Sequence, residues 1–152
     1  MASGLEHDKA IKIWTVPLGI LIGIICNAQL GIIFGITFLI GGLWLSPDLD
    51  TLSIPLRRWG LLRIIWLPYR KLIKHRSFFS HGILIGTTIR LLYLIGITIL
   101  ISYLVSKIFD IDPILSINSL KLIKDLYPEE LLASFVGIEA SAWLHLIKDT
   151  NE

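Results

Sequence analysis

The sequence predicts an all-α integral membrane protein with four transmembrane helices and a basic interfacial loop between the second and third helices. Three observations support this fold class. Of the 152 residues, 54% are hydrophobic and only 17% are charged, whereas a soluble domain carries about 25% charged residues. The mean hydropathy is +0.74. The apolar residues also fall in long runs, and the basic residues concentrate between two of these runs, as in a membrane protein.

The first long run predicts two helices. Residues 16–45 contain no charged side chain, and one helix over this run would be about 45 Å long, more than the ~30 Å hydrocarbon core needs. A turn at residues 27–29 divides the run into helices at about 9–27 and 30–46. A cleaved signal peptide is the alternative, with Lys9 and Lys12 as its charged region and residues 26–28 as the cleavage site. The apolar run continues beyond that site, which argues against the alternative.

Two further runs complete the predicted bundle. Residues 82–106 contain a single charged residue, Arg90. Residues 131–148 form a weaker fourth span, since they include Glu139 and His145. Between these spans we expect a short amphipathic helix within residues 107–127. No linker interrupts the chain, so residues 1–152 are predicted to form a single membrane domain. G-x-x-x-G pairs, which let helices approach closely in lipid, occur within the predicted spans.

The loop over residues 47–81 sets the expected orientation. It contains half of the fourteen basic residues and no acidic residue after Asp50. Basic loops stay in the cytoplasm, so four spans also place both termini there, in a bacterial plasma or thylakoid membrane. Trp59, Trp66 and Tyr69 lie among the cations, which is typical of a segment that contacts membrane lipid at the headgroup level. No nucleic-acid-binding motif is present, so we expect no nucleic acid partner.

All four histidines and four of the aspartates fall at the predicted cytoplasmic helix ends. The helix count therefore brings together residues that are far apart in sequence: His7, Asp8, Asp48, Asp50, His75, His81, His145 and Asp149. Imidazole and carboxylate ligands suit zinc, manganese or iron. Eight candidates exceed what one ion takes, which favours two divalent ions sharing a bridging hydroxide. Each residue alone would more commonly be a solvated cap or a turn residue.

Spacing gives three local expectations for these residues. The i, i+4 spacing of His145 and Asp149 places them on one helix face. Asp48 and Asp50 would share a side of an extended segment. His75 and His81 are poorly spaced for one helix face, so we expect a bend between them.

Two further residues are candidates for catalysis. Arg76 lies nearest the proposed ions and would hold an anionic substrate. Glu139 is an intramembrane carboxylate, which is costly in lipid and therefore a candidate general base or extra ligand. Arg90, the other intramembrane charge, would pair with Glu139 or line a polar cavity below the site.

Four motifs carry a family resemblance: "HDKAIKIW", "SPDLDTLS", "RRWGLLRIIWLPYRKLIKHRSFFSHG" and "WLHLIKD". They resemble the cyanobacterial family of uncharacterised metal-binding membrane proteins, which looks related to bacterial membrane-bound metal-dependent hydrolases. The resemblance covers nearly the whole chain, and residues 46–82 are its most specific part. It implies a metal site at His7, Asp48, Asp50, His75, His81, His145 and Asp149. It also implies hydrolysis as a predicted activity, without naming a substrate.

The sequence thus predicts a metal-dependent hydrolase at the cytoplasmic membrane face. Its substrate is expected to be a phosphoester, either a phosphorylated molecule or a lipid-linked one. A lipid-linked substrate fits because the site would open at the headgroup level. The alternative is a metal-binding membrane protein that senses, carries or inserts the ion without catalysis. A third interpretation, a purely structural membrane subunit, predicts that no metal binds.

Overall fold

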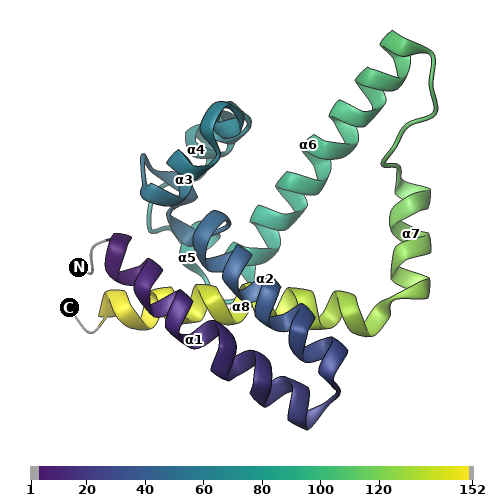
Figure 1. Ribbon diagram of the computed structural model, residues 1–152. Helices are drawn as coiled ribbons and strands as arrows, with labels where there is room; N and C mark the ends of the chain where they lie inside the picture. The colour runs from purple at the N-terminus through teal and green to yellow at the C-terminus, as the bar shows by residue number, and fades with distance from the viewer. Residues whose placement is uncertain (1–3, 151–152) are drawn as a thin grey trace.

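The computed structural model describes residues 4–150, and these residues form helices and no β-strand. Four helices are long, and the others are short or of 3-10 type (Figure 1). In chain order they are α1 (Gly4–Ile25), α2 (Ala28–Trp44), η1 (Pro47–Asp50), α3 (Ile54–Arg58), η2 (Gly60–Trp66), α4 (Leu67–Leu72), α5 (Phe78–His81), α6 (Ile85–Phe109), α7 (Ile117–Leu126) and α8 (Pro128–Thr150). The ends of the predicted 1–152 domain, residues 1–3 and 151–152, lie outside the described range.

Helices α1 and α2 form a tight hairpin. Asn27 starts α2, since its side chain accepts a hydrogen bond from the Leu30 N–H, and such a cap satisfies one of the unpaired donors at a helix start. The two helices are close at Gly31, where an added Cβ would lie 2.6 Å from the Gly19 carbonyl oxygen. The predicted turn at residues 27–29 is therefore present, one residue earlier than expected.

Helix α8 packs across α2 and also contacts α1 (Figure 1). Small residues again permit the approach, because a Cβ on Gly41 would lie 2.5 Å from the Ser141 hydroxyl. The buried core here consists of Ile11, Phe34, Phe38 and Leu43. Helix α2 is thus the central element, held by α1 and α8.

Residues 47–81 are a chain of short helices rather than a simple loop. They enclose a second core around Leu49, Trp66 and Tyr69. The rings of Trp66 and Tyr69 meet edge to face. The expected extended conformation of residues 48–50 is wrong. Pro47 follows Ser46, whose side chain accepts from the Asp48 N–H, and this start directs the chain into the 3-10 turn η1.

Helix α6 leaves the other helices, and few of its residues are fully buried (Figure 1). Its first turns pack against α5 and α8, and Tyr93 contacts the Trp66 ring and donates to the Ile65 carbonyl of η2. At the far end, α7 connects α6 to α8, which confirms the expected short helix within residues 107–127. A capping box at Ser116 and Ser119 starts α7.

Three helices among the described residues are long and apolar enough to cross a membrane, not the four predicted. They are Ala28–Asp50, Ile85–Phe109 and Pro128–Thr150. Helix α1 does not qualify, because Asp8, Lys9 and Lys12 lie in its first half. The apolar remainder, Ile13–Ile25, is about 20 Å long, too short for the ~30 Å core.

Candidate metal centre

Four separate parts of the chain meet at one end of the molecule: the first turns of α1, η1, the α4–α5 segment and the last turns of α8. Figure 1 shows the two described ends of the chain close together there. The structure brings together the residues expected from the sequence to bind metal, and we call them the His/Asp cluster: His7, Asp48, Asp50, His75, His81, His145 and Asp149.

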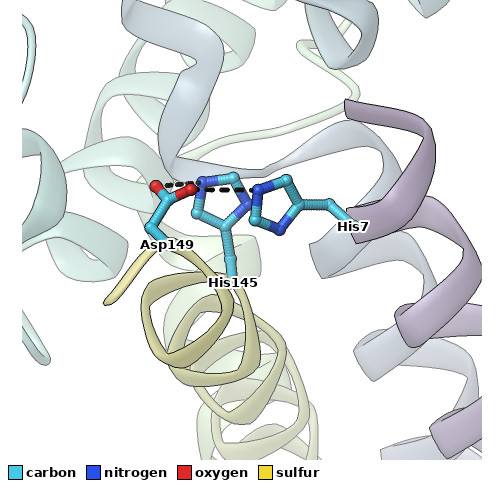
Figure 2. A group of neighbouring side chains, drawn as sticks. All are labelled: His7, His145 and Asp149. Atoms are coloured by element: carbon cyan, nitrogen blue, oxygen red, sulfur yellow. Dashed lines mark hydrogen bonds and ion pairs between the residues drawn. The ribbon is translucent and has the colours of Figure 1, made fainter. Parts of the chain in front are cut away.

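His7, His145 and Asp149 form the first group of the cluster (Figure 2). The two imidazole rings stack with their centroids 3.9 Å apart. The Asp149 carboxylate lies beside both rings, with Oδ1 3.1 Å from His7 Nε2 and Oδ2 3.6 Å from His145 Nε2. His7 comes from α1 and the other two from one face of α8, so this group holds α1 against α8.

Asp48, His75 and His81 form the second group. Asp48 also connects the two groups, since its Oδ1 lies 3.7 Å from His81 Nε2 and 3.5 Å from His145 Nε2. This group is the more open one: the side chains of His75 and Asp48 are 43% and 25% exposed. The cluster is therefore continuous, and solvent reaches it on the side of the second group.

Asp50 lies behind the histidines and belongs to neither group. Its side chain is fully buried, and its Oδ1 is 2.9 Å from His75 Nδ1. Its Oδ2 is 3.7 Å from His81 Nδ1. A carboxylate on the Nδ1 side of a histidine directs the Nε2 lone pair outward, which is how metal-binding histidines are commonly oriented.

The cluster contains buried polar atoms without a hydrogen-bond partner. They include His81 Nε2, His145 Nε2 and Asp50 Oδ2. An unpaired buried polar atom costs about 1–3 kcal/mol, so a set of them at one place calls for a missing partner. Two ligand atoms on a tetrahedral ion, each about 2.1 Å from it, lie about 3.4 Å apart. The 3.5–3.7 Å separations around Asp48 Oδ1 and His145 Nε2 are close to that spacing.

The electrostatics of the first group favour the neutral form of His7. Burial lowers the pKa of His7 below its ordinary value, and the adjacent His145 lowers that pKa further, against the opposite effect of Asp149. A neutral imidazole is the form that binds a metal ion.

Asp8 lies outside the cluster. Its carboxylate accepts a hydrogen bond from Arg58 Nη2, and Arg58 Nη1 donates to the Leu43 carbonyl at 2.8 Å. Arg58 thereby ties the first turns of α1 to the end of α2, and so fixes the backbone that carries His7. This role could not be predicted from the sequence, because Arg58 is one of many cations in a basic segment.

Arg76 and Glu139 lie in different surroundings. Arg76 is exposed between α4 and α5, with a left-handed φ of 57°. Glu139 is buried, and its Oε1 accepts from the Leu84 N–H at 2.8 Å and from the Trp143 Nε1–H. Arg90 forms no ion pair with Glu139 among the described residues; it donates to the Ser80 carbonyl and to the Thr87 hydroxyl.

An all-helical fold with three helices that could cross a membrane and a shared His/Asp cluster defines a class of candidate metal-binding proteins. Within that class, the chain belongs to the family described as "Uncharacterized metal-binding protein (DUF2227)", whose pattern matches residues 2–152. The family description names metal binding and no activity.

The curated proteins include a relative from Aquifex aeolicus, described as "Uncharacterized protein". It is 42% identical to this chain over 62 residues, which are 40% of this chain and 43% of the relative. The match thus spans less than half of the relative's length. No solved structure matches the chain.

Proposed function

We propose that this protein is a bacterial membrane protein that binds two divalent ions in the His/Asp cluster and hydrolyses a phosphoester at the membrane surface. The observation that carries the proposal is the geometry of Asp48, whose Oδ1 lies between His81 of one ligand group and His145 of the other. A carboxylate shared by two ligand groups is the arrangement expected of a two-ion site.

The residues fit such ions in kind and in number. His7, His145 and Asp149 would hold one ion, and His75 and His81 the other, with Asp48 between them. Nitrogen and carboxylate ligands of this kind suit zinc, manganese or iron. We assign Asp50 to orienting His75 rather than to direct ligation, since its Oδ1 lies 2.9 Å from His75 Nδ1.

When bound, two such ions would supply Lewis-acid activation of water and would offset the negative charge of a phosphoester. The chain supplies the remaining functions. The open side at His75 and Asp48 admits the substrate, and the exposed Arg76, next to His75, would hold its anionic oxygens. For Glu139 the contacts support a positioning role, since its Oε1 is occupied by two donors.

The basic segment, residues 54–79, supports a membrane-bound substrate. It contains no acidic residue, and exposes large apolar side chains such as Leu61, Leu72 and Phe78 next to its cations. Such a surface fits the headgroup level of an anionic bilayer. His75 is part of this segment, so the cluster would open toward lipid headgroups, with the termini on the cytoplasmic side. A lipid-linked phosphoester is therefore the favoured substrate.

Metal carrying or sensing without catalysis is the second candidate. It is favoured by the burial of the first group, in which His7 and His145 are 7% and 5% exposed, because an enclosed site holds its ion without offering it to substrate. Open coordination positions at the second group would distinguish catalysis from storage.

Hydrolysis by the purified full-length protein tests the proposal. The protein in detergent is loaded with zinc, manganese or iron and incubated with bis(p-nitrophenyl) phosphate and with phosphatidic acid. Release of nitrophenol or phosphate that is lost in Asp48→Asn supports a hydrolase. The control is Asp110→Asn, the same change at an exposed residue at the far end of α6. Full metal loading without turnover on either substrate would favour the carrier.

A further inference from the structure

Arg90 is the one charged residue of α6 before its last turn, and it is 1% exposed. Its Nη1 donates to the Ser80 carbonyl at 2.7 Å, and its Nη2 donates to the Thr87 hydroxyl at 2.9 Å. Tyr69, Glu139 and Asp50 lie near enough to interact with its charge. A buried arginine in an apolar helix is costly, so its retention calls for a role. Here the arginine holds Ser80, the residue that precedes His81.

The face of α6 that carries Arg90 is shaped to receive Ser80. Gly86 lies one turn before Arg90, and a Cβ at Gly86 would be 2.5 Å from the Ser80 carbonyl oxygen. Any larger residue would therefore displace that carbonyl from the guanidinium. Gly86 and Arg90, at i and i+4, form a socket on one helix face for the Ser80 carbonyl.

Ser80 in turn contacts His81. Its side chain is fully buried, and its Oγ lies 2.8 Å from His81 Nδ1. The Ser77 and Lys74 carbonyl oxygens, 3.3 and 3.5 Å from Oγ, can accept the proton of the Ser80 hydroxyl. Oγ is then free to accept from Nδ1–H, which leaves the lone pair of His81 on Nε2, the atom that faces Asp48.

We infer that Arg90 and Ser80 are positioning residues that set the place and the tautomer of His81. This inference rests on the proposed metal centre. Arg90 holds the backbone of α5 through the Ser80 carbonyl, and the Ser80 hydroxyl selects the Nδ1–H form of the imidazole. Helix α6 is thereby connected to the second ligand group. Partners of this kind change metal affinity about 10- to 100-fold when they are removed.

Ser80→Ala tests the inference most cleanly, because it removes the hydroxyl and leaves the carbonyl that Arg90 holds. Ser77→Ala is the matched control: the residue lies in the same turn, and its hydroxyl has no hydrogen-bond partner among residues 4–150. Zinc affinity of the full chain in detergent is measured by competition with a chelator. We expect about 10-fold weaker binding or more for one of two zinc ions in Ser80→Ala, and wild-type binding in Ser77→Ala.

The tautomer of His81 gives a second readout that needs no metal. In ¹⁵N-histidine-labelled apo protein, wild type should show His81 protonated at Nδ1, and Ser80→Ala should show a shift toward Nε2–H. Arg90→Lys should retain part of the zinc affinity, whereas Arg90→Met should weaken it at least as much as Ser80→Ala. If Arg90→Met does not fold, Ser80→Ala and Ser77→Ala still test whether the Ser80 hydroxyl positions His81.

The outcomes separate this inference from the proposed function. Wild-type protein that binds zinc, with unchanged affinity and tautomer in Ser80→Ala, overturns the positioning role and leaves the metal centre intact. Wild-type protein that binds no zinc overturns the metal centre, while the apo tautomer still reports the Ser80–His81 contact. Equal losses in Ser80→Ala and Ser77→Ala would also overturn the inference, since they would show a general effect on the turn.

Discussion

At the scale of single residues, the two aspartates of η1 have different surroundings, since the side chain of Asp48 is 25% exposed and that of Asp50 is fully buried. Asp48 lies between histidines of both ligand groups, whereas Asp50 lies on the Nδ1 side of His75 and His81. We therefore assign Asp48 as the shared ligand and Asp50 as the residue that orients His75, its hydrogen-bond partner.

The first prediction compares the same substitution at these two aspartates. Asp48→Asn should remove at least one equivalent of bound metal, because the amide is a poor ligand for a shared position. Asp50→Asn should keep the metal content but weaken affinity about 10- to 100-fold. Elemental analysis and chelator competition measure the two effects. If Asp50→Asn loses metal outright while Asp48→Asn retains it, the assignments are reversed.

The second prediction concerns the pH dependence of stability in the metal-free protein. Burial lowers the pKa of His7 in the folded chain. As the pH falls through the ordinary histidine pKa of about 6.5, the unfolded chain therefore binds more protons than the folded chain does. The contribution of His7 to the free energy of unfolding is therefore complete above a pH of about 6.5, and it decreases as the pH falls below that value. Melting temperatures of chelator-treated wild type and His7→Gln should show a flatter profile for the variant; parallel profiles would refute the prediction.

At the scale of elements, close helix contact at glycine is the basis of the α1–α2 hairpin. The third prediction is that Gly31→Ala destabilises the protein by about 1–3 kcal/mol, because its Cβ would meet the backbone of Gly19 and Gly23. Gly96→Ala is the control: nothing lies within 4 Å of its added Cβ, so stability should be unchanged or slightly higher. Denaturation in detergent compares them, and equal effects would contradict this account of the hairpin.

The basic segment is the element expected to contact lipid. The fourth prediction is that Arg63→Glu combined with Lys71→Glu reduces retention of phosphatidylglycerol by the purified protein, because both side chains are exposed and no acidic residue offsets them. Each such cation contributes about 1 kcal/mol near an anionic surface. Lys121→Glu with Lys124→Glu in α7 is the matched control. Native mass spectrometry counts the bound lipid, and equal losses in the two double variants would argue against a specific surface.

The elements were predictable where one local signal dominates. Long apolar runs gave α2, α6 and α8, and the turn at Asn27 followed from the length limit on a single span. The 3-10 turn η1 was missed because alternation of Asp48 and Asp50 also fits an extended segment. The cap at Ser46 and the proline at position 47 decide between the two. The fourth span was wrong because the charges of α1 leave too few apolar residues.

At the scale of the whole molecule, topology explains why the candidate site could be predicted in outline. Antiparallel helices return the chain to the same end, so residues as distant as His7 and Asp149 become neighbours, with 3.1 Å between their polar atoms. The supporting residues could not be predicted in this way. Arg58, Ser80 and Gly86 act through contacts to backbone carbonyls or a neighbouring side chain, and nothing in their local sequence distinguishes them from surface or packing residues.

The central claim is that the His/Asp cluster is a metal centre, and metal content tests it most directly. Full-length protein is purified in detergent with zinc, manganese and iron resupplied, and its metal is measured by elemental analysis next to Asp48→Ala and the control Asp110→Ala. We predict about two equivalents per chain in wild type and in the control, with loss in Asp48→Ala. Folded wild-type protein without metal, or an unchanged content in Asp48→Ala, would contradict the claim.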